Sequence, residues 1–221
     1  MTAPAPVRAA FKQALKEAWA GGAGALLPLG FFAGAAVLVP LTLGPNTATL
    51  SGTATAVLWI ALALSSLVTM ERLFQADLED GALDLWVMDD APVSQIAFAK
   101  TFAHWLVSGL PLVALAPLLG LILGVAPGEL PRAAVAYGVG GLAFFFWGGF
   151  GASLAAGVRR GGLLIALIAL PFYVPTAIFG ALTLASPTGV PPEALMLAAC
   201  TLFAIAIAPF AMAAALRLAV D

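Results

Sequence analysis

Residues 193–216, EALMLAACTLFAIAIAPFAMAAAL, carry one charge at their first position, Glu193, and none at the positions that follow. A helix of this length, at about 1.5 Å per residue, exceeds the roughly 30 Å of hydrocarbon in a bilayer. Lipid offers no hydrogen-bond partner to the backbone, so such a segment must satisfy its own backbone groups as a helix. The stretch therefore predicts a transmembrane helix near the end of the chain.

Five further segments share this composition, and each reaches the roughly 20 residues that a membrane-spanning helix requires. The alternating pattern of a membrane β-strand is absent from all of them. We therefore predict an all-α, polytopic membrane protein in which residues 1–221 form a single transmembrane domain. Its six transmembrane helices are expected at about residues 22–44, 50–70, 97–124, 132–158, 162–186 and 193–216.

The overall composition supports a membrane protein and argues against several other classes. Of the 221 residues, 62% are hydrophobic and 9% are charged, whereas soluble domains have about 25% charged residues. The net charge of −2 gives no basic excess of the kind that nucleic-acid binding requires. The single cysteine, Cys200, excludes an internal disulfide bond and a multi-cysteine metal site.

The basic residues predict how these helices are oriented in the membrane. Arg132 alone falls on one side of the expected spans, and the other eight of the nine basic residues fall on the opposite side. Cytoplasmic loops carry the excess of lysine and arginine, so both termini are expected in the cytoplasm. The eight residues are Arg8, Lys12, Lys16, Arg72, Lys100, Arg159, Arg160 and Arg217.

The beginning of the chain predicts an amphipathic helix at residues 5–20, before the first span. On a helix, its apolar and its cationic residues form two adjacent stripes, an arrangement suited to the headgroup layer of a membrane. We expect an interfacial elbow helix that leads into the first span. The alternative is a juxtamembrane tail that only sets the topology. The stripes consist of Val7, Phe11, Leu15 and Trp19 and of Arg8, Lys12 and Lys16.

A polar segment, residues 71–92, separates the second and third spans. Its first part, ERLFQADLEDGALDLWVMDD, holds seven acids and one base. Leu73, Phe74 and Leu78 share a helical face, and Gly81 is expected to end or bend that helix. Acids contribute little to insertion topology, so their number here indicates docking of a soluble partner. The alternative is a loop that its charges keep solvated.

We find no sequence motif for catalysis, for a metal ion or for a cofactor. Lys12, Lys16 and Lys100 do not follow the glycines of a nucleotide-binding loop, and zinc and haem-attachment motifs are missing as well. One histidine and one cysteine in distant spans do not supply the paired nucleophile and base of an intramembrane enzyme. His104, a turn inside the third span, could ligate haem. Without a second histidine, a structural hydrogen bond is the favoured interpretation.

Several of these stretches together resemble the cytochrome c maturation protein B family, CcmB. The similarity is carried by LSSLVTMERLFQADLEDGALDLW at 64–86 and by AKTFAHWLVSGLPLVALAPLLGLILG at 99–124. It continues in VRRGGLLIALIALPFYVPTAIFGA at 158–181 and in APFAMAAALRLA at 208–219. The early stretch LPLGFFAGAAVLVPLTLGPN at 27–46 also fits. The resemblance therefore covers nearly the whole chain.

The resemblance implies a permease subunit of an ABC-type complex in the bacterial inner membrane. Its partners would be the ATPase CcmA, the proteins CcmC and CcmD, and a second copy of the chain itself. The complex would use ATP hydrolysis in CcmA to release the haem-loaded chaperone CcmE during c-type cytochrome biogenesis. Hydrolysis in a separate subunit would account for the missing nucleotide-binding loop.

At the level of residues, the resemblance implies that segment 71–92 couples the ATPase to the spans. We call these residues the coupling segment. Asp84, where the family is expected to have glutamate, and the pair Asp89 and Asp90 depart from the family pattern. Two rival functions work without an ATPase partner: a self-contained membrane transporter and a haem-binding membrane protein. The residues that match the coupling motif are Glu71, Arg72, Leu73, Phe74, Asp77, Leu78, Asp80 and Gly81.

Overall fold

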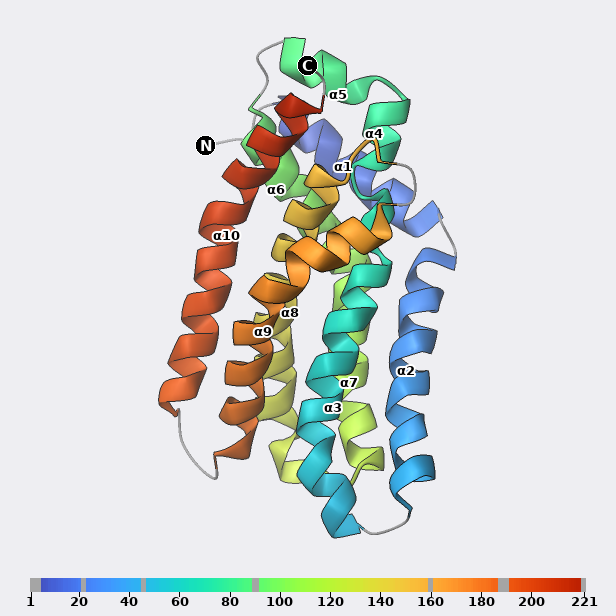
Figure 1. Ribbon diagram of the computed structural model, residues 1–221, viewed down its shortest axis with the longest axis vertical. Helices are drawn as coiled ribbons and strands as arrows, with labels where there is room; N and C mark the ends of the chain where they lie inside the picture. Colours follow the sequence, from blue (N-terminus) through green and yellow to red (C-terminus); the bar gives the residue numbers. More distant parts are fainter. Residues whose placement is uncertain are drawn as a thin grey trace.

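The computed structural model describes residues 5–20, 23–44, 47–88, 92–158, 161–186 and 191–219. Within these residues every regular element is a helix (Figure 1). Six helical segments of the described chain are long and apolar enough to cross a membrane, which confirms the predicted all-α membrane fold with six spans. Four charged residues that the sequence analysis singled out, Asp89, Asp90, Arg159 and Arg160, lie outside the described residues.

The six spans are formed by long helices, and shorter helices connect or precede them. The spans are α2 (Ala23–Leu43), α3 (Thr47–Val68), the continuous run of α6 (Val93–His104), η2 (Trp105–Gly109) and α7 (Leu110–Ile122), then α8 (Leu130–Leu154), α9 (Gly162–Ala185) and α10 (Pro192–Leu218). The shorter helices are α1 (Ala5–Ala20), η1 (Met70–Arg72), α4 (Gln75–Glu79), α5 (Ala82–Met88) and η3 (Pro127–Glu129).

The long helices form one bundle, with α1, α4 and α5 gathered at one end of it (Figure 1). We call this end the α4 end. The helix α8 is the most buried of the six spans and contacts α3, α6, α7, α9 and α10. Its sequence is rich in glycine, and small residues let neighbouring helices approach closely in a membrane. This composition explains why α8 occupies the centre of the bundle.

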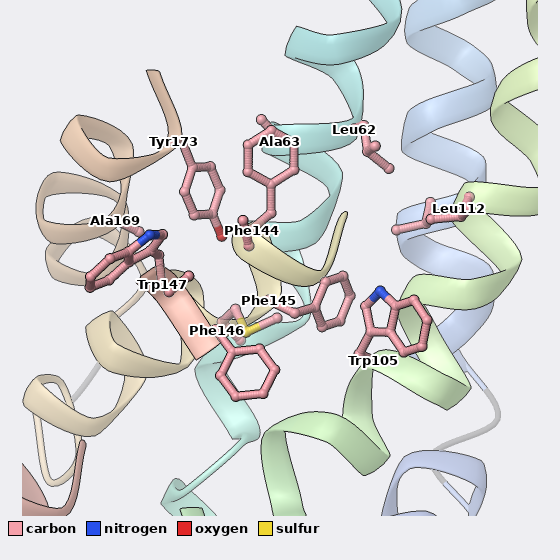
Figure 2. Packing of buried hydrophobic residues seen from close by; sticks show 14 of the residues in the cluster. Leu62, Ala63, Trp105, Leu112, Phe144, Phe145, Phe146, Trp147, Ala169 and Tyr173 are labelled. Atoms are coloured by element: carbon pink, nitrogen blue, oxygen red, sulfur yellow. The ribbon is translucent and has the colours of Figure 1, made fainter. Parts of the chain in front are cut away.

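Aromatic side chains of α8 fill the core between its neighbours (Figure 2). Phe144, Phe145 and Phe146 are all buried. The ring of Tyr173, from α9, lies 4.6 Å from the ring of Phe144, and its hydroxyl is hydrogen-bonded to that of Ser66 in α3 at 3.1 Å. A buried phenol needs such a partner because an unpaired hydroxyl in an apolar core is costly. The pair therefore fixes α3 and α9 against α8.

The side chain of Trp59 in α3 occupies the space that two glycines leave open. A Cβ atom at Gly140 of α8 would lie 2.4 Å from this ring, and one at Gly180 of α9 would lie 2.3 Å from it. Trp59 also packs 4.9 Å from the ring of Tyr137. The tight contact between α3, α8 and α9 therefore depends on the absence of side chains at the two glycines.

Replacement of Gly180 by alanine is expected to destabilise the fold by about 1–3 kcal/mol, because the added methyl group would overpack the core against Trp59. Gly52 in α3 is the matched control, since a Cβ there would meet nothing within 4 Å. Gly52→Ala should be neutral or stabilise its helix by up to about 1 kcal/mol. Unfolding midpoints in detergent micelles measure both changes. Equal shifts for the two variants would contradict this packing.

Arg132 is held by hydrogen bonds at the end of the bundle opposite the α4 end. Its guanidinium donates to the backbone oxygen of Thr183 at 2.6 Å and to that of Ser186, and it pairs with Glu129 at 3.5 Å. The last carbonyl groups of a helix have no partners within the helix, so a cation at the end of α9 satisfies them. The one base that the sequence places on this side therefore has a structural function.

The helix α1 lies across the α4 end and packs against α6 (Figure 1). Its buried residues are Val7, Ala10 and Ala14, and Val7 and Ala10 form a small core with Ile96 and Ala99 of α6. The predicted apolar stripe thus differs from the observed one: Phe11 and Leu15 are only partly buried, and the side chain of Trp19 lies outside the described part. The reason is that α1 packs on protein through small residues.

Candidate coupling site

The segment between the second and third spans folds into three short helices, η1, α4 and α5. The sequence predicts a short amphipathic helix that ends or bends at Gly81. In the structure α4 ends at Glu79, the backbone N–H of Asp80 donates to the carbonyl oxygen of Ala76, and Gly81 follows at φ 72°. A positive φ favours glycine because glycine has no Cβ to clash with the backbone. The predicted break at Gly81 is therefore present, and α5 begins directly after it.

The residues of the coupling segment divide into an inner and an outer group. Leu73, Phe74 and Asp77 lie inside the protein, with side chains that are almost completely buried, and Leu83 of α5 joins them. Leu78 and Gly81 are half-buried. The outer group consists of the exposed residues Glu71, Arg72, Glu79, Asp80, Asp84, Leu85 and Met88.

Asp77 forms a buried ion pair with Lys100 of α6. The Lys100 Nζ donates to both carboxylate oxygens of Asp77, at 2.6 Å and 2.5 Å, and each side chain is 1% exposed. Removing two charges from water carries a penalty of several kcal/mol per ion, which close pairing offsets. Neither charged side chain could therefore be buried here without this short bidentate contact.

Two further elements complete the surroundings of Lys100. Glu17 of α1 lies 3.5 Å from its Nζ and is 39% exposed. The ring of Trp86 in α5 lies 5.6 Å from the same atom, within range of a cation–π interaction. The ammonium group thus joins α1, α4, α5 and α6. If α1, α4 or α5 is displaced, α6 must therefore move with it or these contacts must break.

A row of polar side chains continues from Lys100 of α6 into the bundle. Lys100 and His104 of α6 and Ser108 of η2 follow one another at spacings of four residues, so they lie on one face of the continuous helical run. They line a cavity of about 550 Å³ whose wall also includes Glu17 and Arg72. Between His104 and α7 the chain forms the π-helical turn η2, a local form that occurs often at functional sites. The coupling segment therefore adjoins a cavity that has these three polar side chains along one wall.

His104 lies in the wall of this cavity. One side of its ring is hydrogen-bonded to the backbone of Thr69, just after α3. Its Nε2 is buried and has no hydrogen-bond partner among the described residues, and its ring centroid lies 5.7 Å from that of Phe145. The histidine thus links α6 to the turn just before the coupling segment and leaves its Nε2 without a partner among the described residues.

Sequence reasoning did not identify Lys100 and Glu17 as part of this site. Lys100 was named among the basic residues that set the topology and among the lysines that do not fit a nucleotide-binding loop, and Glu17 was not singled out. A signal was present: Lys100 stands within an otherwise apolar run, inside the third predicted span. A charge at such a place needs a counter-charge, and the nearest acidic cluster is the coupling segment. That reasoning leads to the segment but does not select Asp77 among its acids.

Comparison with known proteins gives the family. The family described as CcmB protein matches residues 6–219, which include α1 from its second residue, the coupling segment and all six spans. This chain belongs to the CcmB family. Heme exporter protein B of Paracoccus denitrificans (strain Pd 1222) is 43% identical over 206 residues, which are 92% of this chain and 94% of that protein. Heme exporter protein B of Escherichia coli (strain K12) is 35% identical over 214 residues, 96% and 97% of the two chains. The match to the CcmB family therefore includes the coupling segment.

Proposed function

We propose that this chain is the membrane-spanning subunit of an ABC-type haem exporter complex that acts in c-type cytochrome biogenesis. The relatives that bear the name Heme exporter protein B match over almost their whole length, which supports this assignment. The chain has no nucleotide-binding loop, so ATP would be hydrolysed by a separate subunit, CcmA. The chain itself is then a transporter component and not an enzyme.

The observation that carries the coupling role is the two-sided coupling segment. Its outer side offers exposed acids to a soluble partner, and its inner side is joined to α6 through Asp77 and Lys100. An ATPase bound to the outer side would move α4 and α5 together with the start of the third span. ATP can shift the complex from one conformation to another only as far as it binds the two with different affinity. The buried ion pair would transmit the resulting movement from α4 to α6.

The remaining partners follow from the same assignment. The α4 end would face the cytoplasm of a bacterial inner membrane, because CcmA hydrolyses ATP there and most bases of the chain lie at that end. An ATPase dimer would require two copies of this chain or one copy with a similar partner. CcmC and CcmD would complete the complex, and hydrolysis would release haem-loaded CcmE from CcmC.

A second candidate function rests on His104. Its unpartnered Nε2 and the adjoining cavity of about 550 Å³ favour a haem-binding membrane protein that works without an ATPase. A neutral imidazole nitrogen is a common haem ligand. This candidate differs from the first in requiring bound haem and no CcmA.

Co-purification with CcmA separates the two candidates. The tagged chain is purified in detergent from cells that also produce CcmA, and ATP hydrolysis and haem absorbance are both measured. We expect CcmA to co-purify and its hydrolysis rate to rise in the presence of the chain. A CcmA variant without catalytic activity is the control. Absence of CcmA together with a haem spectrum that is lost in His104→Ala would overturn the coupling assignment in favour of haem binding.

A further inference from the structure

An apolar groove runs along the outside of the bundle between α1, α6 and α10. It has a volume of about 660 Å³ and contains the rings of Phe98 and Phe102 from α6 and of Phe210 from α10, with Ile205 beside them. Phe98 and Phe210 are exposed, at 38% and 68%. The groove is separate from the cavity at Lys100 and plays no part in the proposed coupling.

Two cations stand at one side of this groove. Arg8 and Lys12 of α1 line it, and both are exposed. Neither has an ion pair with another described residue; the ion pairs found in the described chain involve Lys100 and Arg132. No acid is among the described residues that line the groove, and Ser94 and Gln95 add uncharged polar groups. The groove is therefore apolar with an uncompensated positive end.

The order of these residues along α6 gives the groove a direction. Ser94 and Gln95 belong to the first turn of α6, at the α4 end, and Phe98 and Phe102 follow one and two turns further into the bundle. Polar and cationic groups thus lie near the end of the bundle, and aromatic rings lie deeper. This distribution matches an amphiphile with an anionic head and a hydrocarbon chain, oriented along the membrane normal.

We infer that the groove binds an anionic phospholipid, with its phosphate near Arg8 and Lys12 and an acyl chain along Phe98, Phe102 and Phe210. The two cations favour a lipid with an anionic headgroup, because each basic residue beside a membrane surface raises the affinity for anionic lipid by about fivefold. The exposed rings select the chain, because they face the bilayer and bury apolar area against it. The inference does not rest on the proposed function and holds whether or not CcmA binds.

Lipid exchange on the purified chain tests this site. The chain in detergent is titrated with phosphatidylglycerol or with phosphatidylcholine, and bound lipid is counted by native mass spectrometry. We expect phosphatidylglycerol to bind more tightly, and Arg8→Gln/Lys12→Gln to reduce that preference by about 25-fold, the product of about fivefold for each of the two cations. Lys16→Gln is the control: Lys16 is also an exposed cation of α1, and it does not line the groove.

Two further experiments test the groove without changing α1. Ala206→Trp places a large ring in the groove and should weaken binding of both lipids, since it removes space for the acyl chain. Phosphatidylglycerol with a photoreactive acyl chain should form adducts on the peptides that contain Phe98, Phe102 and Phe210.

Three results would overturn the inference: equal affinity for the two lipids, an equal loss of preference in Lys16→Gln, or adducts outside these peptides. Crosslinks between two copies of the chain through the groove would overturn it as well, because they would assign the groove to a second copy.

Discussion

Replacement of Lys100 by methionine is expected to destabilise the protein by about 3–5 kcal/mol, the penalty for removing one partner of a buried ion pair. The substitution keeps an unbranched side chain as far as the ε carbon, places sulfur at the δ position and removes the ammonium group. Asp77, 1% exposed, would then hold a carboxyl group in an apolar interior without its counter-charge. The unfolding midpoint of the purified chain in detergent micelles measures the loss.

The double variant Asp77→Leu/Lys100→Met distinguishes a buried charge from lost packing. Replacing both members of a buried pair by apolar groups is often neutral or stabilising, so the double variant should regain most of the stability. Lys16→Met is the control, because an exposed lysine should change stability by no more than about 0.5 kcal/mol. A double variant as unstable as Lys100→Met would show that the ion pair is not the source of the loss.

The same pair of variants separates stability from coupling. If Asp77 and Lys100 only stabilise the fold, the double variant should regain both stability and ATPase stimulation. If the ion pair also carries movement from α4 to α6, the double variant should fold well and still respond less to CcmA. Glu17, which is 39% exposed, is expected to contribute at most about 1 kcal/mol, since exposed ion pairs are weak.

The six spans could be predicted from the sequence because each one is determined by its own composition. A run that is almost free of charge and long enough to cross the hydrocarbon must be helical, whatever its neighbours are. The position of the coupling segment could be predicted for a similar reason, since its acids interrupt the apolar chain. The break at Gly81 was predictable because glycine is the residue that tolerates the left-handed conformation.

The inner and outer sides of the coupling segment could not be read from the sequence. A helix of five residues, such as α4, completes hardly more than one turn, so its periodicity does not define a face. Asp77 is buried because Lys100, 23 positions later, reaches it from another helix. Such a tertiary partner leaves no local pattern. The face of α1 was missed likewise, because Ala10 and Ala14 were not counted as apolar contacts.

Reversal of the two exposed acids in Asp80→Lys/Asp84→Lys is expected to weaken CcmA binding by about tenfold or more, because like charges opposed across an interface cost several kcal/mol. Both side chains lie on the outer side of the coupling segment, so the unfolding midpoint should stay within the range of an ordinary surface substitution. Affinity for CcmA is measured by titration at low salt. Glu193→Lys, at the opposite end of the bundle, is the control.

Comparison with Phe74→Ala makes this prediction specific to the contact surface. Phe74 is 1% exposed, so its truncation should lower stability by about 3–5 kcal/mol through a cavity and impair CcmA only through the fold. The charge reversal should show the opposite pattern: lost binding with preserved stability, and a smaller effect at about 1 M salt, where the Debye length is about 3 Å. If Asp80→Lys/Asp84→Lys binds CcmA as the unaltered chain does at low salt, the ATPase does not dock on the acids of the coupling segment. The buried pair of Asp77 and Lys100 would then stabilise the bundle without receiving force from that side.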